Sequence, residues 1–238
     1  MTLSYDGSKF RGFQLQRDGT KTVANKLERV FKRLKIDSAF NASGRTDSFV
    51  HALNQVIDIN LPPYWSDLDK LKTTLNRHLH PEIHIKQIKV VDHDFHARFS
   101  AKKREYRYII KEGEYSVFEA PYVLFYDKRL DIELLKEAIK VFEGEHDFRN
   151  FMKSGSDVLS SVRRVYKTLA YRYNDSLILS FIANGYLRSQ IRMMVAYLLM
   201  INEGKKSIDD LKDELSLKHS SNIKPIEPNG LYLARIWY

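Results

Sequence analysis

The segment from Asn41 to Ala52, NASGRTDSFVHA, carries the residues of this chain best suited to chemistry. Its carboxylate, Asp47, lies two residues after the cation Arg45 and four residues before His51. Gly44 precedes Arg45, and a residue without a side chain lets backbone or a ligand approach closely. This polar run predicts a loop that brings a cation and a carboxylate to the same place. The alternative is a surface turn in which Asp47 caps the loop and Arg45 is solvated.

Other polar candidates lie in the second half of the chain. They are the strand start with Tyr106 and Tyr108, the segment with Arg188 and Arg192, and the strand start Gly230-Leu231-Tyr232. Arg188 and Arg192 are four residues apart and are predicted to share one face of a helix from Leu187 to Asn202. Because apolar residues flank Arg192, its side chain needs an anion, for which Asp47 is a candidate. The alternative is that Arg192 reaches water from the helix edge.

Several chemistries are excluded by the residues that the chain lacks. It contains no cysteine, so it has no thiolate metal ligand and no thiol nucleophile. It has neither a Walker-type phosphate loop nor a GxGxxG run, and neither an HExxH helix nor a GxSxG elbow. We therefore expect a site that uses a carboxylate without a metal or a cofactor.

The charge of the chain favours a polyanionic partner. Lys and Arg total 39 against 30 Asp and Glu, a net charge of +9, and 14 Tyr and 13 Phe are available to stack on bases. The basic residues form clusters at Lys32-Arg33-Lys35, Lys102-Lys103-Arg104, Arg163-Arg164 and Lys205-Lys206. No apolar run approaches the length of a membrane span and no signal peptide is recognised, so we expect a cytoplasmic protein that does not bind membranes.

The periodicity of apolar residues predicts the order β-α-β-β-α-β in each half of the chain. That order indicates an α+β fold of two split-βαβ halves, ferredoxin-like or RRM-like, with mostly antiparallel sheets and an active-site cleft between them. We expect one domain over residues 1–96, carrying the Asp47 loop, and another over residues 97–238, carrying Tyr106, Arg192 and Leu231. Helix starts are predicted at Thr22 and Ser66, with a capping box at Ser207 and Asp210.

Several ordered motifs resemble those of the TruA family of tRNA pseudouridine synthases. The segment from Gly44 to Ala52 matches the family pattern GRTDxxVHA. The similarity continues along almost the whole chain, at Tyr5-Asp6-Gly7-Ser8 with Gly12 and Gln14, Phe95 to Ala101, Tyr106-Arg107-Tyr108, Gly144 to Phe148, Gln190 to Val195 and Gly230 to Leu233.

This resemblance implies an enzyme that isomerises uridine to pseudouridine at positions 38, 39 and 40 in the anticodon stem-loop of tRNA. Asp47 is then the catalytic carboxylate, and Arg192 is the cation that keeps it charged. A stacked base is unreachable, so the uridine is flipped out, and the resemblance implies that Arg45 replaces the base or pushes it out. Tyr106 stacks on the flipped ring, with Tyr108 as the alternative, while Leu231 closes the apolar side of the pocket.

The resemblance also implies a homodimer that grips one tRNA with both subunits, and Arg188 is placed with the substrate-binding residues. Two departures from the family pattern stand out. Phe49 occupies a position where the family usually has glycine, and Phe13 replaces a common tryptophan. If position 49 needs a positive φ, a phenylalanine there is strained. The alternative function is a tRNA-binding or tRNA-folding module that has lost catalysis.

Overall fold

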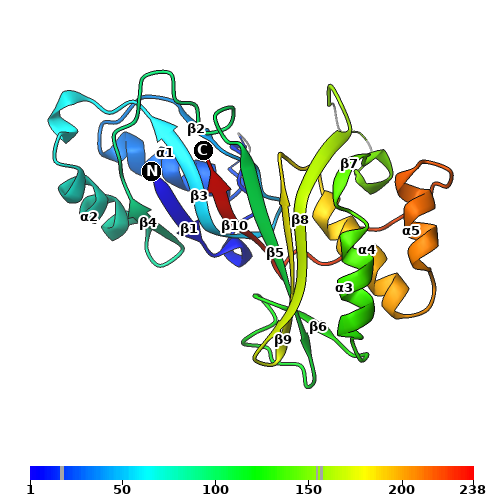
Figure 1. Cartoon of the computed structure of the whole chain (residues 1–238). Coiled ribbons are helices and arrows are strands. Elements are labelled where there is room, and N and C mark those ends of the chain that lie inside the picture. The colour runs from blue at the N-terminus through cyan, green and yellow to red at the C-terminus, as the bar shows by residue number, and fades with distance from the viewer. Residues whose placement is uncertain (17–18, 154, 156–157) are drawn as a thin grey trace. The chain divides into compact units, whose positions relative to one another are not determined.

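The computed structural model describes residues 1–16, 19–153, 155 and 158–238 (Figure 1). The chain divides into two compact units, the first formed by Met1–Lys102 with Tyr232–Tyr238 and the second by Lys103–Leu231. Compared with the expected division after residue 96, the first unit continues to Lys102 and also contains most of the last strand. In the described residues, no helix is long and apolar enough to cross a membrane.

The first unit contains two helices and a mixed sheet. Its elements are β1 (Thr2–Tyr5), α1 (Val23–Arg33), β2 (Phe40–Ala42), β3 (His51–Ile59), α2 (Leu68–Leu79), β4 (Ile83–Gln87) and β10 (Leu231–Trp237). The strand order is β4-β1-β3-β10, and β2 pairs with the far end of β3. β1 is antiparallel to β3 and β4, whereas β10 is parallel to β3, with Tyr232 opposite His51.

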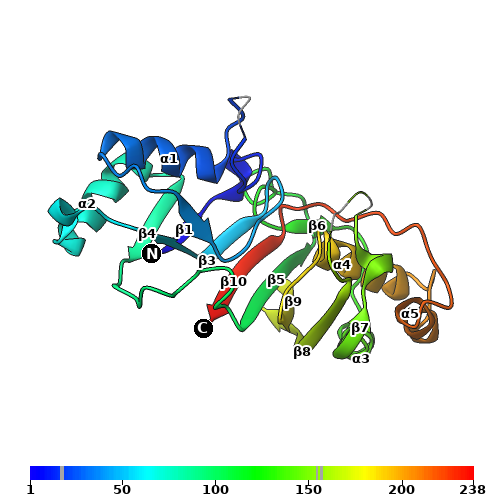
Figure 2. The ribbon, with the colours of Figure 1, turned by 90° about the horizontal axis from the view of Figure 1, so that it is seen from above.

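Both helices of the first unit lie on one side of its sheet (Figure 2). Their apolar stripes, spaced at helical intervals, bury completely against the sheet residues. The core side chains include Leu3, Leu27, Phe31, Ile57, Leu71, Leu75 and Ile85. Removing these apolar surfaces from water is the main stabilising contribution to this unit, and it fixes the sheet that carries the ends of the Asp47 loop.

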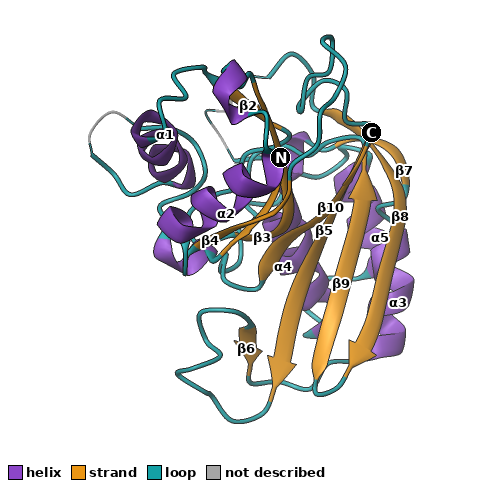
Figure 3. Cartoon of the chain, turned by 90° about the vertical axis from the view of Figure 1, so that its left-hand side faces the viewer, coloured by secondary structure: helices purple, strands orange, loops and turns teal. Residues whose placement is uncertain are grey.

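The second unit is a mostly antiparallel sheet covered on one side by helices (Figure 3). Its elements are β5 (Lys103–Glu112), β6 (Leu124–Tyr126), α3 (Ile132–Lys140), β7 (Gly144–Asp147), β8 (Val162–Tyr173), β9 (Ser176–Ala183), α4 (Gln190–Asn202) and α5 (Ile208–Leu215). The strand order is β5-β9-β8-β7, and β6 adds to β5 in parallel. The α+β fold with mostly antiparallel sheets is therefore confirmed.

Local signals predicted several element boundaries. Thr22 caps α1 by accepting a hydrogen bond from the amide of Asn25, and Ser207 forms the predicted capping box with Asp210 at α5. The prediction of Ser66 as the cap of α2 was wrong. The cap is Asp67, whose side chain accepts the amide of Lys70, and a carboxylate also interacts favourably with the positive end of a helix.

Candidate active site

The loop that carries Asp47 connects β2 to β3, and its base is fixed by a buried amide side chain. The Ser43 hydroxyl donates to Oε1 of Gln55 at 2.6 Å, and Nε2 of Gln55 donates to the carbonyl of Gly44 at 2.9 Å. Ser43 and Gln55 are both buried, so their polar atoms need these partners. The start of the loop is thereby tied to the middle of β3.

The N-terminal segment holds the same loop from its other side. The Tyr5 hydroxyl is hydrogen-bonded to the Thr46 hydroxyl at 2.9 Å, and the amide of Phe13 donates to the Thr46 carbonyl at 3.0 Å. The amide of Phe49 donates to the carbonyl of Phe10 at 3.3 Å. These contacts bracket Asp47, so residues 43–50 form an ordered loop and not a loose surface turn.

The closest approach between the two segments is made by Gly7. A Cβ atom on Gly7 would lie 2.2 Å from the carbonyl oxygen of Val50, a separation that no side chain permits. Because Gly7 has no side chain, its amide reaches Nδ1 of the buried His51 at 3.0 Å. An imidazole that accepts at Nδ1 carries its proton on Nε2 when neutral. The His51 ring also stacks on Tyr232, with ring centroids 4.6 Å apart.

Sequence patterns did not reveal the positioning role of Gly7 and His51. Tyr5-Asp6-Gly7-Ser8 and His51 were recognised only as parts of motifs that resemble the family, with no contact predicted between them. The clue in the sequence was Gly7 itself, because glycine is the residue that allows two backbone segments to approach closely.

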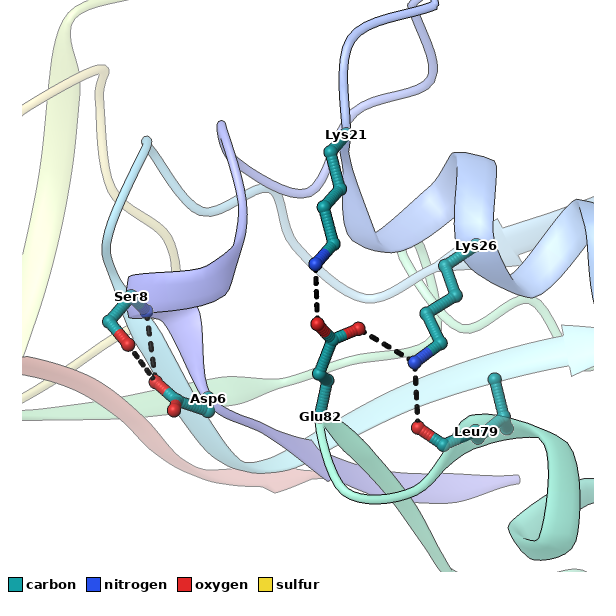
Figure 4. Close-up of polar contacts among 6 residues, drawn as sticks. All are labelled: Asp6, Ser8, Lys21, Lys26, Leu79 and Glu82. Atoms are coloured by element: carbon teal, nitrogen blue, oxygen red, sulfur yellow. Dashed lines mark hydrogen bonds and ion pairs between the residues drawn. The ribbon is translucent and has the colours of Figure 1, made fainter.

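A second polar cluster fixes the turn around Asp6 (Figure 4). Oδ1 of Asp6 accepts from both the amide and the hydroxyl of Ser8, at 3.0 and 2.6 Å, and the amide of Asp6 donates to the carbonyl of Glu82 at 3.0 Å. The Glu82 carboxylate pairs with Lys21 and Lys26, the latter at 2.7 Å. Partial burial raises the pKa of Glu82, but hydrogen bonds from the two lysines outweigh it and lower the pKa below its ordinary value.

Arg45 and Asp47 lie on the same loop, as predicted, with Arg45 exposed and Asp47 partly exposed. Phe49, two residues beyond Asp47, has a φ of 65°. This left-handed conformation brings the Cβ of an ordinary residue too close to its own backbone, so Phe49 is strained. The guanidinium carbon of Arg11 lies 5.2 Å from the centre of the Phe49 ring. The loop therefore keeps a glycine-like backbone although the glycine is absent.

In the second unit, Tyr106 and Tyr108 point to the same face of β5 but differ in their surroundings. Tyr108 is fully buried, and its hydroxyl donates to the carbonyl of Glu227 at 2.7 Å. Burial raises the pKa of Tyr108 far above its usual range. Tyr106 is 8% exposed and packs edge-on against Tyr186, with ring centroids 5.3 Å apart. The Tyr108 hydroxyl thus anchors the backbone at Glu227, whereas Tyr106 is slightly more exposed.

Arg192 is half-buried on α4, and its Nε donates to the carbonyl of Ile226 at 2.5 Å. The amide of Ile226 returns a hydrogen bond to the Arg192 carbonyl at 3.3 Å. Arg188 does not share a face of this helix, so that prediction was wrong. The helix begins only at Gln190. Ser189, just before it, has a φ of 60°, which is not helical, so the exposed Arg188 lies outside the helix.

Leu231 is buried at the start of β10, and Gly230 determines its position. The Gly230 carbonyl accepts from the amide of Ile109 at 2.8 Å, and a Cβ on Gly230 would lie 2.6 Å from the Ile109 carbonyl. The strand of Tyr106 and the segment of Leu231 are thereby brought together. Of the predicted site residues, Arg45 and Asp47 belong to the first unit, and Tyr106, Arg188, Arg192 and Leu231 to the second.

Comparison with known proteins identifies the family. The sequence model of the tRNA pseudouridine synthase family matches residues 1–100 and 138–238. The chain belongs to the tRNA pseudouridine synthase family. A relative from Campylobacter jejuni strain RM1221, tRNA pseudouridine synthase A, is 42% identical over 236 residues, which cover 99% of this chain and 98% of the relative. A relative of the same name from Geobacillus sp. strain WCH70 is 40% identical and covers 100% of this chain and 96% of the relative.

Among solved structures, one chain of a Cbf5-Nop10-Gar1 complex aligns with 84% of this chain and 44% of its own length. Its TM-score is 0.37 and its sequence identity is 12%, a similarity too weak to support any argument. The sequence relatives alone confirm the predicted resemblance. Family membership makes this chain an isomerase that acts on tRNA.

The strain at Phe49 generates a stability prediction. We expect Phe49→Gly to raise the free energy of unfolding by roughly 1 kcal/mol, because glycine adopts a positive φ without a steric penalty. For a chain of this size, the melting temperature should rise by about 2–4 °C. Thermal unfolding followed by circular dichroism measures the change.

Phe49→Ala is the matched control, since it removes the aromatic ring but keeps the penalty of the positive φ. The alanine variant should be no more stable than the wild type. Equal melting temperatures for the glycine and alanine variants would show that the backbone at position 49 stores no strain.

The lowered pKa of Glu82 generates a prediction about pH. Its folded-state pKa lies below the unfolded-state value, so its ion pairs stabilise the fold above the ordinary carboxyl pKa and lose that effect as the pH falls through the folded-state pKa. Glu82→Gln should lower the free energy of unfolding at pH 7 by roughly 1 kcal/mol. The difference from the wild type should shrink below about pH 4.5.

Urea unfolding at a series of pH values measures this difference. Glu28→Gln is the control, because Glu28 pairs with Lys32 on the exposed surface of α1, where screening makes an ion pair weak. The same loss of stability in both variants, or a Glu82→Gln effect that does not depend on pH, would contradict the assignment.

Proposed function

We propose that this enzyme isomerises uridine at positions 38, 39 and 40 in the anticodon stem-loop of tRNA, with Asp47 as the catalytic carboxylate. Membership of the family makes the chain an isomerase that acts on tRNA. The assignment of Asp47 is carried by one observation, the bracketing of its loop by β3 and by the N-terminal segment. A carboxylate on such a loop is held in one place before the substrate arrives, which is how an enzyme avoids reorganising charge during reaction.

The reaction needs no redox partner. The bond between N1 of uracil and C1′ of ribose breaks, the base rotates, and a bond forms between C5 and C1′. The proton on C5 is lost and N1 gains one, so atoms and electrons balance within the nucleotide and water. Asp47 can act by attacking the sugar, by attacking the base or by removing a proton from the sugar, and each route uses an ionised carboxylate.

The remaining residues are assigned to holding the flipped nucleotide. Arg45, exposed next to Asp47 on the same loop, is proposed to occupy the space that the base leaves in the stem. Tyr106 is proposed to stack on the uracil ring. Tyr106 is slightly less buried than Tyr108, whose hydroxyl is hydrogen-bonded to the backbone of Glu227, and this difference supports Tyr106 over Tyr108.

Leu231 is proposed to form the apolar wall, and its position next to the strand of Tyr106 supports this role. Arg192 is proposed as the counter-ion of Asp47 in the substrate complex. The hydrogen bond from its Nε to Ile226 supports the assignment, because it orients the guanidinium group before substrate binds. The exposed Arg188 is proposed to contact an RNA phosphate. A homodimer and a cytoplasmic location remain predictions.

The assignment of Asp47 predicts that Asp47→Asn abolishes turnover while leaving tRNA affinity within a few-fold of the wild type, because the amide keeps the shape but cannot act as nucleophile or base. Release of tritium from tRNA labelled at C5 of uridine measures turnover. Filter binding measures affinity. Asp69→Asn, an equivalent change at an exposed position of α2, should leave turnover unchanged.

Tritium release by the Asp47→Asn variant at the wild-type rate would remove Asp47 from its role but keep the enzyme class. No release by the wild type, with tRNA still bound, would favour the alternative of a binding or folding module.

The net charge of +9 predicts that binding depends steeply on salt. Each neutralised phosphate contributes a slope of about 0.7 to 0.9 in a plot of log affinity against log salt concentration. If about six phosphates are contacted, affinity should fall roughly a thousandfold between 50 and 200 mM salt. A flat response would contradict binding through basic residues.

A further inference from the structure

The hydroxyl groups of Tyr186 and Tyr197 are both buried in the second unit without a hydrogen-bond partner among the described residues, and only Tyr186 contacts Tyr106. Tyr186 lies in the connection between β9 and α4, and its hydroxyl oxygen is buried without a hydrogen-bond partner among the described residues. Buried hydroxyl groups in folded proteins almost always have partners, because an unsatisfied one loses its hydrogen bonds to water. An exception is a reason to ask which group satisfies it when the protein is working.

The connection that carries Tyr186 is fixed by contacts of the residues that follow it. The amide of the next residue, Leu187, donates to Oε1 of Gln190 at 2.8 Å, and Gln190 is itself buried. Two residues further on, Ser189 has the positive φ that begins α4. The backbone that follows Tyr186 is therefore held in place.

The ring of Tyr186 meets the ring of Tyr106 edge-on, at an interplanar angle of 82°. Burial raises the pKa of Tyr186 well above its usual value, and the nearby Tyr106 and Glu105 raise it further, against a smaller opposite effect of Arg104. The hydroxyl therefore stays protonated and able to donate at any pH at which the enzyme works. It is an unused donor beside the residue assigned to the flipped base.

We propose that the Tyr186 hydroxyl donates a hydrogen bond to an oxygen of the flipped uridine, which makes Tyr186 a further substrate-binding residue beside Tyr106. The inference rests on the proposed function, since it takes Tyr106 as the residue that stacks on the uracil. Uridine presents acceptor oxygens on its base, ribose and phosphate, and one of them supplies the partner that the free protein lacks. The donor then recovers on binding the hydrogen bond that it lost on folding.

The test replaces only the hydroxyl. Tyr186→Phe keeps the ring packed on Tyr106, and we expect kcat/KM for tRNA to fall about tenfold, as for the loss of one hydrogen bond between neutral groups. The melting temperature should stay the same or rise, because an unsatisfied buried group has been removed. Tritium release from C5-labelled tRNA under initial-rate conditions gives kcat and KM.

Tyr197→Phe is the matched control. Tyr197 lies on α4 with its side chain fully buried against Phe151, and its hydroxyl also lacks a partner among the described residues. This variant makes the same chemical change at a position not assigned to the substrate. We expect its kinetic constants to equal those of the wild type, and its stability to be equal or higher.

Equal kcat/KM for Tyr186→Phe and Tyr197→Phe, with the wild type active, would overturn the inference and leave the Tyr186 hydroxyl a structural irregularity. An inactive wild type would instead refute the proposed function. Replacing the target uridine by 4-thiouridine, which carries sulfur in place of O4, tests whether O4 is the acceptor. The Tyr186→Phe penalty disappears with this substrate if O4 is the acceptor, and it persists if another oxygen of the nucleotide accepts.

Discussion

The missing side chain of Gly7 is the constraint on which the Asp47 loop depends. Only glycine lets the first turn of the chain lie against the backbone of Val50, where any Cβ atom would overlap the carbonyl oxygen. That approach allows the hydrogen bond between the Gly7 amide and His51, and it sets the path of residues 10–13 that hold Thr46 and Phe49. The position of the carboxylate is therefore decided by contacts made through its neighbours.

The second unit uses the same device at Gly230. The absence of a side chain there lets the segment before β10 lie on the backbone of Ile109, close to the ring of Tyr108. Tyr108 adds its own hydrogen bond to the carbonyl of Glu227. In each unit, a glycine joins a connecting segment to a strand, and the residues proposed to meet the substrate are positioned by that contact. Backbone approaches of this kind are stiff, because they leave no side chain to change rotamer.

The sequence predicted what depends on near neighbours in the chain. Thr22 and the pair Ser207 and Asp210 were identified because a helix cap is made within three residues. The choice of Ser66 over Asp67 failed because both are good caps and only the backbone angles decide between them. Arg188 was placed on a helix that begins only after Ser189, because an apolar pattern does not show where a residue adopts a left-handed backbone conformation.

The residue types of the candidate site could be predicted from the sequence, but the long-range contacts that hold the Asp47 loop could not. The run from Gly44 to Ala52 identified Asp47 and Arg45, whereas the contact of Gly7 with His51 joins residues 44 positions apart. Contacts of that range follow from how strands pair, and no local pattern contains them. The order β-α-β-β-α-β predicted for the second half did not include the short strands β6 and β7, because their existence depends on the longer strands β5 and β8 beside them.

The backbone of Phe49 shows how strongly the loop is determined by its surroundings. A phenylalanine at a φ of 65° persists only where other interactions outweigh the steric cost. Those interactions are the hydrogen bond that the Phe49 amide donates to the Phe10 carbonyl, and the hydrogen bonds to the side chain and the carbonyl of Thr46. The loop could relax by flattening at Phe49, but doing so would move Asp47 and break contacts on both sides. The strain at Phe49 thus indicates that the contacts on either side of Asp47 determine the loop conformation more strongly than the backbone preference of Phe49 does.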